Sequence, residues 1–570
     1  MIGTYAAVLA ICAASLAVGQ AAIRILGGRR WSWLAPAVGL AVLCAACWAT
    51  VRMPGNGLVS AVVVLVLAMG SVAYLWGRVE GGGEALGVGW PVALGALLAA
   101  SLPFAVEGHF GILGTSFNPD MSQHLLAADR LADGQPSQLL NQGYPLGPHS
   151  IVVALNKGLG IGLVQGFSGL TIAVAVLASV TALTAFRDLP ALPRTAGALL
   201  VGLAYVAASY LAQGAFKETM QALFLLAFVL ALREGDRSWI DLSLRYVPAA
   251  LIAVGSAYTY SFPGLIWLGG AAVIWALLTR PALRALGIAL IVFLVATLPE
   301  IGRMLDFHSF ETFDPNGPGL GNLFGQISPF EVLGVWPSGD FRLAPGDGAV
   351  PALAYYLGIA FGLALFLYGL VWLWKRRENA ILAGVAAAAL AYLAARVAGT
   401  PYTAAKAIEI ASPLVALTIL LPLLSSVPWF LSDDRRPKRT TQRLWAPIAA
   451  ALFIAAAGVC SLLALANAPV GPTSYSSSLS EYRKLVGEGP TVVYASPQLL
   501  EEEHGGPFLA WELRGGRVCI KSTEDPEVPP GVRFAIWDEG DWTLKRISDP
   551  DPGKSPCPLV AERQARQGPR

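Results

Sequence analysis

Long apolar stretches separated by short charged or Gly/Pro-rich segments dominate the chain. A bilayer core of roughly 30 Å is crossed by about 20 apolar helical residues. This spacing predicts about 14 transmembrane helices. They are expected near residues 4–26, 33–51, 58–77, 88–106, 161–186, 195–213, 217–233, 245–260, 262–279, 283–299, 351–374, 379–397, 402–430 and 444–466. Only YTYSFPG separates the eighth from the ninth, and it fits either a tight hairpin or a kink in a longer helix.

Basic residues test this count, because successive spans alternate sides and short cytoplasmic loops are rich in Lys and Arg. If Arg29 and Arg30 are cytoplasmic, alternation places the other basic loops there too, including DDRRPKR. The N-terminus, loops 107–149 and 300–350, and the tail from 467 are then outside. Merging the helices around YTYSFPG would break this agreement, so we predict two separate spans.

Composition supports a polytopic α-helical membrane protein. Of the 570 residues, 55% are hydrophobic and 13% charged, and soluble domains carry about twice that share of charge. The net charge of +2 gives no reason to expect a nucleic-acid partner. Abundant Ala and Gly, with more Arg than Lys, are typical of a high-GC bacterium. We therefore expect a multi-pass protein of a bacterial plasma membrane that faces a cell-wall space.

Two domains are expected, a transmembrane domain over 1–466 and a small external α/β domain over 467–570. In the second, TVVYAS, RVCIK and VRFAIWDEG are predicted strands, SPQLLEEEHGGPFLAWELRGG a broken helix, and the last residues a frayed tail. Four cysteines lie in predicted spans as apolar fillers. Cys519 and Cys557 lie outside, where a disulfide can persist, although the sequence does not establish that they meet.

The first external loop contains NPDMSQH, residues 118–124. Asn118 suits a helix N-cap and Pro119 the first helical position. Apolar residues then recur at helical spacing, which predicts a short helix on the membrane surface. Asp120 and His124, four residues apart, share one face of it. One interpretation is a carboxylate stabilising a helix start; the other is a general base for a hydroxyl, with histidine as its partner or as a metal ligand.

The segment GYPLGPHSIVVALNKGLG, residues 143–160, predicts a turn followed by a short helix that re-enters the membrane edge. It would form a wall beside Asp120. Tyr144 and His149 are then candidates for substrate binding in the same cavity, or else interfacial anchors.

NPDMSQH on a surface helix, followed by YPLGPH before a long span, resembles the core of the GT-C superfamily of polyprenyl-phosphate-sugar-dependent membrane glycosyltransferases. The resemblance covers roughly residues 88–300 and is actinobacterial-like, with the subfamily unresolved. It implies that Asp120 is catalytic, with His124 assisting. It also implies a polyprenyl-phosphate sugar donor and a glycan or lipid acceptor. The loop follows the fourth span rather than the first, and Asp then His replaces paired acids, so a divalent metal is possible but not assigned.

Three cations at external span ends are candidates for binding the donor phosphate: Lys217, Arg396 and Lys406. Lys217 starts a span, where it opposes the helix dipole, and pairing with Glu218 is the structural alternative. Arg396 and Lys406 flank the short turn Gly399-Thr400-Pro401, and Glu409 can neutralise Lys406 instead.

The 300–350 loop is long, rich in Gly and Pro, and carries acids and aromatic rings that suit a sugar. Glu300, Arg303 and His308 are its candidate substrate-binding residues, and Trp336 is one of its rings. A plain interfacial loop would look similar.

Three hypotheses follow. The first is a membrane glycosyltransferase that moves a sugar to an extracytoplasmic cell-envelope acceptor, with Asp120 as general base. The second is a lipid or polysaccharide transporter or flippase, for which no internal repeat is evident. The third is a non-catalytic envelope assembly protein that works through its tail.

Overall fold

The computed structural model describes residues 1–114, 120–237, 242–307, 319–426, 445–487, 489–501, 505–516 and 518–548. Each of the predicted spans is helical in it. The helices are α1 (Ile2–Ile25), α2 (Ala35–Val51), α3 (Asn56–Leu75), α4 (Gly82–Ala100), α9 (Leu163–Phe186), α10 (Ala191–Gly202), α11 (Tyr205–Ala212), α12 (Phe216–Asp236), α13 (Val247–Thr279), α14 (Leu283–Thr297), α16 (Ala352–Lys375), α17 (Asn379–Ala398), α18 (Pro401–Ser425) and α19 (Trp445–Ala466).

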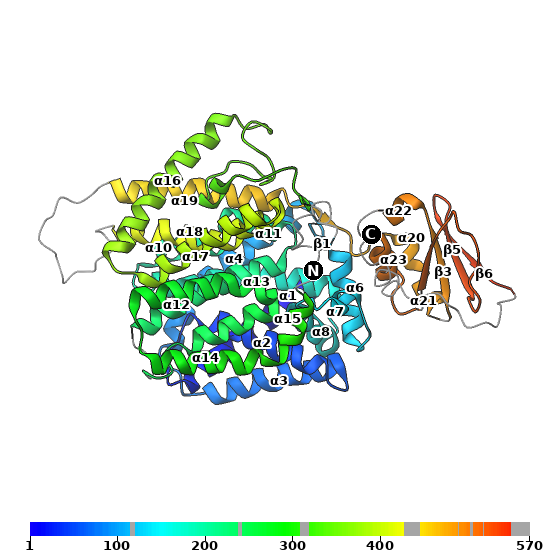
Figure 1. Cartoon of the computed structure of the whole chain (residues 1–570), viewed down its shortest axis with the longest axis horizontal. Coiled ribbons are helices and arrows are strands. Elements are labelled where there is room, and N and C mark those ends of the chain that lie inside the picture. The colour runs from blue at the N-terminus through cyan, green and yellow to red at the C-terminus, as the bar shows by residue number, and fades with distance from the viewer. Residues whose placement is uncertain are drawn as a thin grey trace, which may run out of the picture.

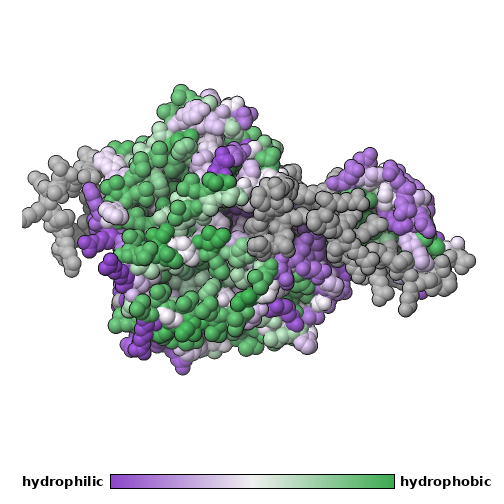
Figure 2. Space-filling view, in the orientation of Figure 1, coloured by the Kyte–Doolittle hydropathy of each residue, from purple (hydrophilic) through white to green (hydrophobic). Residues whose placement is uncertain are grey.

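By length and composition, 9 helices of the described residues can cross a membrane, or up to 10 if α10 and α11, bent by 53°, form one broken span. The helix α2 and residues Ala85–Ala100 of α4 are apolar but shorter. Figure 2 shows hydrophobic residues over most of the visible face of the bundle, with hydrophilic residues gathered at its two ends. The prediction of a multi-pass helical membrane protein is therefore confirmed.

The helix α13 reverses direction within its 33 residues. The rings of Tyr246 and Trp275 lie 4.8 Å apart, although a straight helix would separate them by about 40 Å. Both donate to Asp236, at 2.9 and 3.0 Å. YTYSFPG is thus a hairpin, which confirms two separate spans, and the alternative of a simple kink is wrong.

Ser261 makes this reversal with φ 60° and ψ −153°, a region occupied almost only by glycine and costing about 1–3 kcal/mol. Gln221 of α12 holds the two arms together. Its Oε1 accepts from Ser256 at 2.7 Å, and its Nε2 donates to the carbonyl of Gly264 at 3.0 Å. The strained turn is therefore fixed by the helix it packs against.

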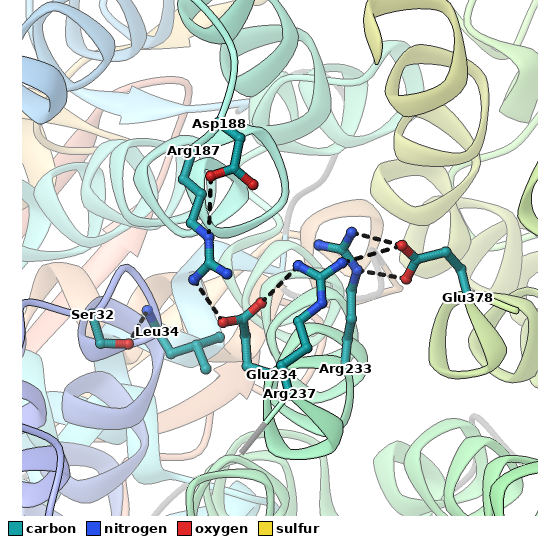
Figure 3. Close-up of polar contacts among 8 residues, drawn as sticks. All are labelled: Ser32, Leu34, Arg187, Asp188, Arg233, Glu234, Arg237 and Glu378. Carbon is teal, nitrogen blue, oxygen red and sulfur yellow. Dashed lines mark hydrogen bonds and ion pairs between the residues drawn. The ribbon is translucent and has the colours of Figure 1, made fainter. Parts of the chain in front are cut away.

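One end of the bundle, here called the basic end, is held by an ion-pair network that joins α9, α12 and α17 (Figure 3). Glu378, next to α17, binds Arg233 through two hydrogen bonds of 2.7 and 2.9 Å, and Arg237 at 3.3 Å. Glu234 binds Arg187 at 2.9 Å and Arg237 at 3.5 Å. The carboxylates and guanidinium groups of this end thus pair with one another across three helices.

At the opposite end, here called the site end, short elements cover the bundle (Figure 1). They are α5 (Leu102–Glu107), β1 (Ile112–Leu113), α6 (Met121–Ala132), α7 (Gln138–Asn141), α8 (Gly147–Leu159), η1 (Leu298–Glu300), α15 (Ile301–Asp306), η4 (Pro329–Leu333) and β2 (Val470–Gly471). The strands β1 and β2 pair antiparallel, Leu113 with Val470. The start of the C-terminal region is thereby tied to the first loop.

The C-terminal domain contains α20 (Ser477–Glu481), α21 (Arg483–Val486), β3 (Thr491–Ala495), α22 (Pro497–Glu501), α23 (Gly505–Glu512), β4 (Val518–Ser522), β5 (Phe534–Asp538) and β6 (Trp542–Arg546). Its sheet has the order β4-β3-β5-β6. The strand β3 is parallel to β4 and β5, and β6 is antiparallel to β5. The three predicted strands and the broken helix are confirmed. The sequence did not reveal β6, a short and partly exposed edge strand.

The C-terminal domain rests on α6, because α23 packs against that helix. Burial raises the pKa of Asp129 on α6, and the Arg514 guanidinium of the domain opposes that rise. Within the domain, Glu512 accepts from the backbone N–H of Tyr475 at 2.6 Å and pairs with Arg483 at 3.3 Å. The domain is therefore docked beside the loop that carries Asp120.

Part of the 300–350 loop is packed rather than open. Trp336 is fully buried and its ring contacts Tyr355 at 4.9 Å, so this ring is not presented to a sugar. The predicted disulfide partner Cys557 lies outside the described residues. Cys12, Cys44, Cys47 and Cys460 are free thiols in the bundle, as expected.

We predict that Glu378→Gln lowers the thermal midpoint of the detergent-solubilised protein. The substitution leaves Arg233 with a neutral amide in place of a two-point carboxylate, a loss of about 2–3 kcal/mol for charge-assisted hydrogen bonds. Asp133→Asn is the matched control, because its pair with Lys157 is exposed and such pairs contribute about 0–1 kcal/mol. Equal midpoints for the two variants would contradict a stabilising role for the network.

Candidate functional site

Asp120 lies directly before α6, as its N-cap residue. The N-cap therefore lies two residues later than the expected Asn118. Asn118 and Pro119 themselves lie outside the described residues. The predicted apolar face is confirmed, since Met121, Leu125 and Ala128 are buried. His124 points from the start of the helix toward His149 of α8 and Phe216 of α12, and Asp120 interacts electrostatically with Lys217 of α12.

His124 and His149 form a direct pair. The Nε2 atom of His149 lies 3.1 Å from Nδ1 of His124. His149 is fully buried, and its ring is enclosed by Phe167 and Phe216 at 5.3 and 5.5 Å. Burial, then His124, then Lys217 hold its pKa well below the usual range. His149 is thus a neutral ring behind His124 rather than a residue facing a ligand.

The ammonium of Lys217 lies 3.9 Å above the ring of Tyr144 and 5.7 Å from that of Tyr260. Lys217 is 8% exposed. The predicted structural alternative, an ion pair with Glu218, is not formed, because the Glu218 carboxylate binds Lys406 instead. Within the described parts of the chain, Lys217 has aromatic rings as neighbours and no ion-paired carboxylate.

Glu218 and Lys406 pair at 3.1 Å across α12 and α18. Tyr260 donates to the same carboxylate at 3.4 Å, and Lys406 lies 4.2 Å above the ring of Tyr402. Glu409, the structural alternative as the partner of Lys406, is fully buried, and among the described residues neither of its oxygens has a hydrogen-bond partner. Lys406 on α18 therefore pairs with a carboxylate on another helix, α12, rather than with Glu409 on its own helix.

Electrostatic interactions join these parts into one site, the charged cluster of Asp120, Tyr144, Lys217, Glu218 and Lys406. Asp120 acts on both lysines. It also contributes, after burial and Glu218, to raising the pKa of Tyr144 well above its usual value. The cluster combines two carboxylates, of which Asp120 is partly buried and Glu218 is buried, with two ammonium groups and a protonated phenol at the end of the bundle.

Four other candidates do not belong to the charged cluster. Arg396 is exposed on α17, whereas Lys406 is buried in its pair with Glu218. Arg303 binds Glu300 at 2.6 Å and donates to the carbonyl of Gly143 at 2.8 Å. These two residues brace the turn before Tyr144. His308 lies outside the described residues.

Sequence reasoning did not identify Tyr260 and Tyr402 as members of the site. Each stands beside a proline turn at the end of a span, in YTYSFPG and GTPYTAAK. A tyrosine at the end of a span is a usable sequence signal for a site residue. A tyrosine that only anchors the protein at the membrane interface, however, occupies the same kind of position. Only the contacts with Lys217, Glu218 and Lys406 distinguish the two roles.

Among the described residues, no group of three or more His, Cys, Asp or Glu side chains could hold a metal ion. Two lysines supply positive charge in the cluster. The arrangement suits an anionic ligand bound beside a carboxylate that can accept a proton.

The fold and the cluster define a multi-pass helical membrane protein with a partly buried charged site at one end of its bundle, beside a small α/β domain. No family model and no curated protein matches the chain. Among solved structures, it is similar to arabinofuranosyltransferase AftD from Mycobacteria, with 15% identity and a TM-score of 0.49, over 78% of this chain and 35% of that one. It is also similar to ArnT from Cupriavidus metallidurans in the apo state, with 14% identity and a TM-score of 0.45, over 79% of this chain and 93% of that one.

The chain spans about a third of the length of AftD. At these identities and TM-scores, the likeness does not establish an activity for this protein. The chemistry must be argued from the residues of the charged cluster.

We predict that acid destabilises the protein through His149. Its native pKa lies below the unfolded value of about 6.5, so the unfolded state binds more protons and stability falls as pH drops below about 6.5. His149→Phe should reduce the loss of thermal midpoint between pH 7.5 and 5.5. His109→Asn, at an exposed histidine, is the control and should keep the wild-type loss. An unchanged loss in His149→Phe would refute this assignment.

Proposed function

We propose that the protein is a GT-C-type membrane glycosyltransferase that moves a sugar from a polyprenyl-phosphate donor to a glycan or lipid acceptor outside the cytoplasm. The observation that carries the proposal is Lys217, a buried ammonium that lies on the ring of Tyr144, has no ion pair among the described residues and interacts electrostatically with Asp120. Burying a cation costs desolvation free energy unless an anion pairs with it. A lipid phosphate at the membrane edge supplies that anion.

The reaction assigned to this site is a single displacement. The acceptor hydroxyl oxygen forms a bond to the anomeric carbon as the bond from that carbon to the phosphate oxygen breaks. The hydroxyl proton passes to Asp120, and the electron pair of the broken bond stays on the phosphate. Lys217 and Lys406 stabilise the charge that develops there, as preorganised cations do in other transfer reactions.

Each remaining residue has a role that follows from its contacts. His124 assists Asp120 from the same helix face, and buried His149 orients the His124 ring through the contact of 3.1 Å. Tyr144 supports Lys217 and lies where the bound sugar would pass. Because Arg396 is exposed, the proposal assigns the phosphate to Lys217 and Lys406.

The proposal places the site end and the C-terminal domain outside the cytoplasm and the basic end inside. This assignment follows from the distribution of Lys and Arg and from the ion-pair network of arginines at the basic end. The donor then enters from the outer leaflet, and the acceptor enters from the cell-wall side next to α6.

The first prediction from this proposal concerns Asp120→Asn in purified protein in nanodiscs. Radiolabelled sugar transfer from polyprenyl-phosphate donors to cell-envelope extract should fall by about 10²–10⁴-fold, because the amide cannot accept the proton. Donor binding should stay within a few-fold of wild type. Asp133→Asn, at the other end of the same helix, is the matched control and should transfer normally.

Wild-type-like transfer by Asp120→Asn would contradict the base assignment. Failure of the wild type to transfer from any such donor would overturn the glycosyltransferase proposal. Movement of labelled lipid across proteoliposomes by that wild-type protein would then favour the transporter.

The second prediction separates charge from shape at Lys217. Lys217→Gln should weaken donor binding by about 10–100-fold, the effect of losing one charge-assisted hydrogen bond of about 1.5–3 kcal/mol. Lys217→Arg should retain more binding than Lys217→Gln. Lys157→Gln, at a partly exposed lysine, is the control. Equal affinity for Lys217→Gln and wild type would exclude Lys217 from the phosphate site.

A further inference from the structure

Glu409 is the least satisfied ionisable group of the described bundle. It lies on α18, one turn beyond Lys406, and is 0% exposed. Neither carboxyl oxygen has a hydrogen-bond partner. Its charged neighbours are Glu218 and Lys406, and it also acts on Tyr210 and Tyr260. Glu409 therefore borders the charged cluster on its membrane side.

The protonation state of Glu409 follows from these neighbours. Lys406 is already matched by Glu218 at 3.1 Å, so a second carboxylate there would add a like charge in an apolar setting. An ionised carboxylate without hydrogen bonds is strongly disfavoured in such a place. Glu409 thus holds its proton and presents an O–H donor beside Lys406. An ionisable residue within a membrane bundle is by default a functional candidate.

The displacement described above creates a need for such a proton. When the bond to the anomeric carbon breaks, the lipid phosphate passes from a diester with one negative charge to a monoester with two. Lys217 is the one lysine of the cluster without a carboxylate partner among the described residues. A proton delivered next to Lys406 would remove the additional charge.

We propose that Glu409 is the acid that protonates the departing lipid phosphate. This inference rests on the proposed glycosyltransferase function. The acceptor proton goes to Asp120, and the proton of Glu409 goes to a phosphate oxygen. Glu409 is then an anion next to Lys406. After the products leave, Asp120 releases a proton to solvent and Glu409 takes one up, so the cycle consumes only donor and acceptor.

The test is a single-turnover measurement with Glu409→Gln, which keeps the shape and a hydrogen-bond donor but has no acidic proton. Transfer from a polyprenyl-phosphate sugar should slow by about 10²-fold, with donor binding within threefold of wild type. A phosphorothioate-linked donor has a more acidic leaving group and depends less on protonation. With that donor, the loss should shrink to less than about tenfold. Ser412→Ala, a buried residue one turn further along α18, is the control and should behave as wild type.

The rate against pH gives an independent readout. The wild-type rate should fall at high pH as Glu409 loses its proton, and Glu409→Gln should lack that decline. If Glu409→Gln does not fold, Glu409→Ala with added formate replaces it, and rescue by formate is the expected result.

Transfer by Glu409→Gln within threefold of wild type would overturn the inference. An equal loss with both donors, or an absence of formate rescue, would assign Glu409 a structural role. Failure of the wild type with both donors would instead overturn the proposed function itself, and the two failures are therefore distinguishable.

Discussion

A charge that enters an apolar bundle needs a partner, and the pair formed by Glu218 and Lys406 is where the site end meets this requirement. The pair joins α12 to α18. Lys217, although adjacent to Glu218 in sequence, is left to the rings of Tyr144 and Tyr260. Glu409, although one turn from Lys406, is left without a hydrogen bond to any part of the chain that the structure describes. A single pairing thus creates both an unmatched cation and an unmatched acid.

The two ends of the bundle use the same side-chain chemistry differently. At the basic end, Glu378 and Glu234 each bind two arginines, and helices α9, α12 and α17 are joined firmly. At the site end, tyrosine rings lie against both lysines of the cluster, and among the described residues only Lys406 pairs with a carboxylate. Rings tolerate a cation without neutralising it. The positive charge at the site end therefore remains available to a ligand, while the ion pairs of the basic end hold its helices together.

Much of the fold could be predicted from the sequence. The positions of the spans depend on local hydropathy, and the side of the membrane on which each loop is expected depends on the distribution of arginine. Alternation of sides even established the hairpin at YTYSFPG, where local pattern alone was ambiguous. The buried face of α6 followed from helical periodicity, and with it the common face of Asp120 and His124.

The site was harder to predict, because its contacts cross between elements. Sequence spacing suggested Glu409 for Lys406 and Glu218 for Lys217, yet Glu218 binds Lys406 from another helix. Arg396 seemed close to Lys406 because the turn is short. The rotation of α17, which a turn length does not specify, leaves Arg396 exposed. Glu300 and Arg303 have the right chemistry for a sugar but use it on each other and on Gly143.

The pairing of β1 with β2 also sets an order of events during synthesis. Leu113 meets Val470, a residue made only after every span has been translated. The C-terminal domain that packs on α6 is made later still. Until then α6 packs against α8, α3 and α9 but lacks the cover of the C-terminal domain, since a nascent chain folds from its N-terminal side first. The contacts of β1 and α6 with the C-terminal region are therefore the last contacts of the site end to form, after all residues of the charged cluster have been made.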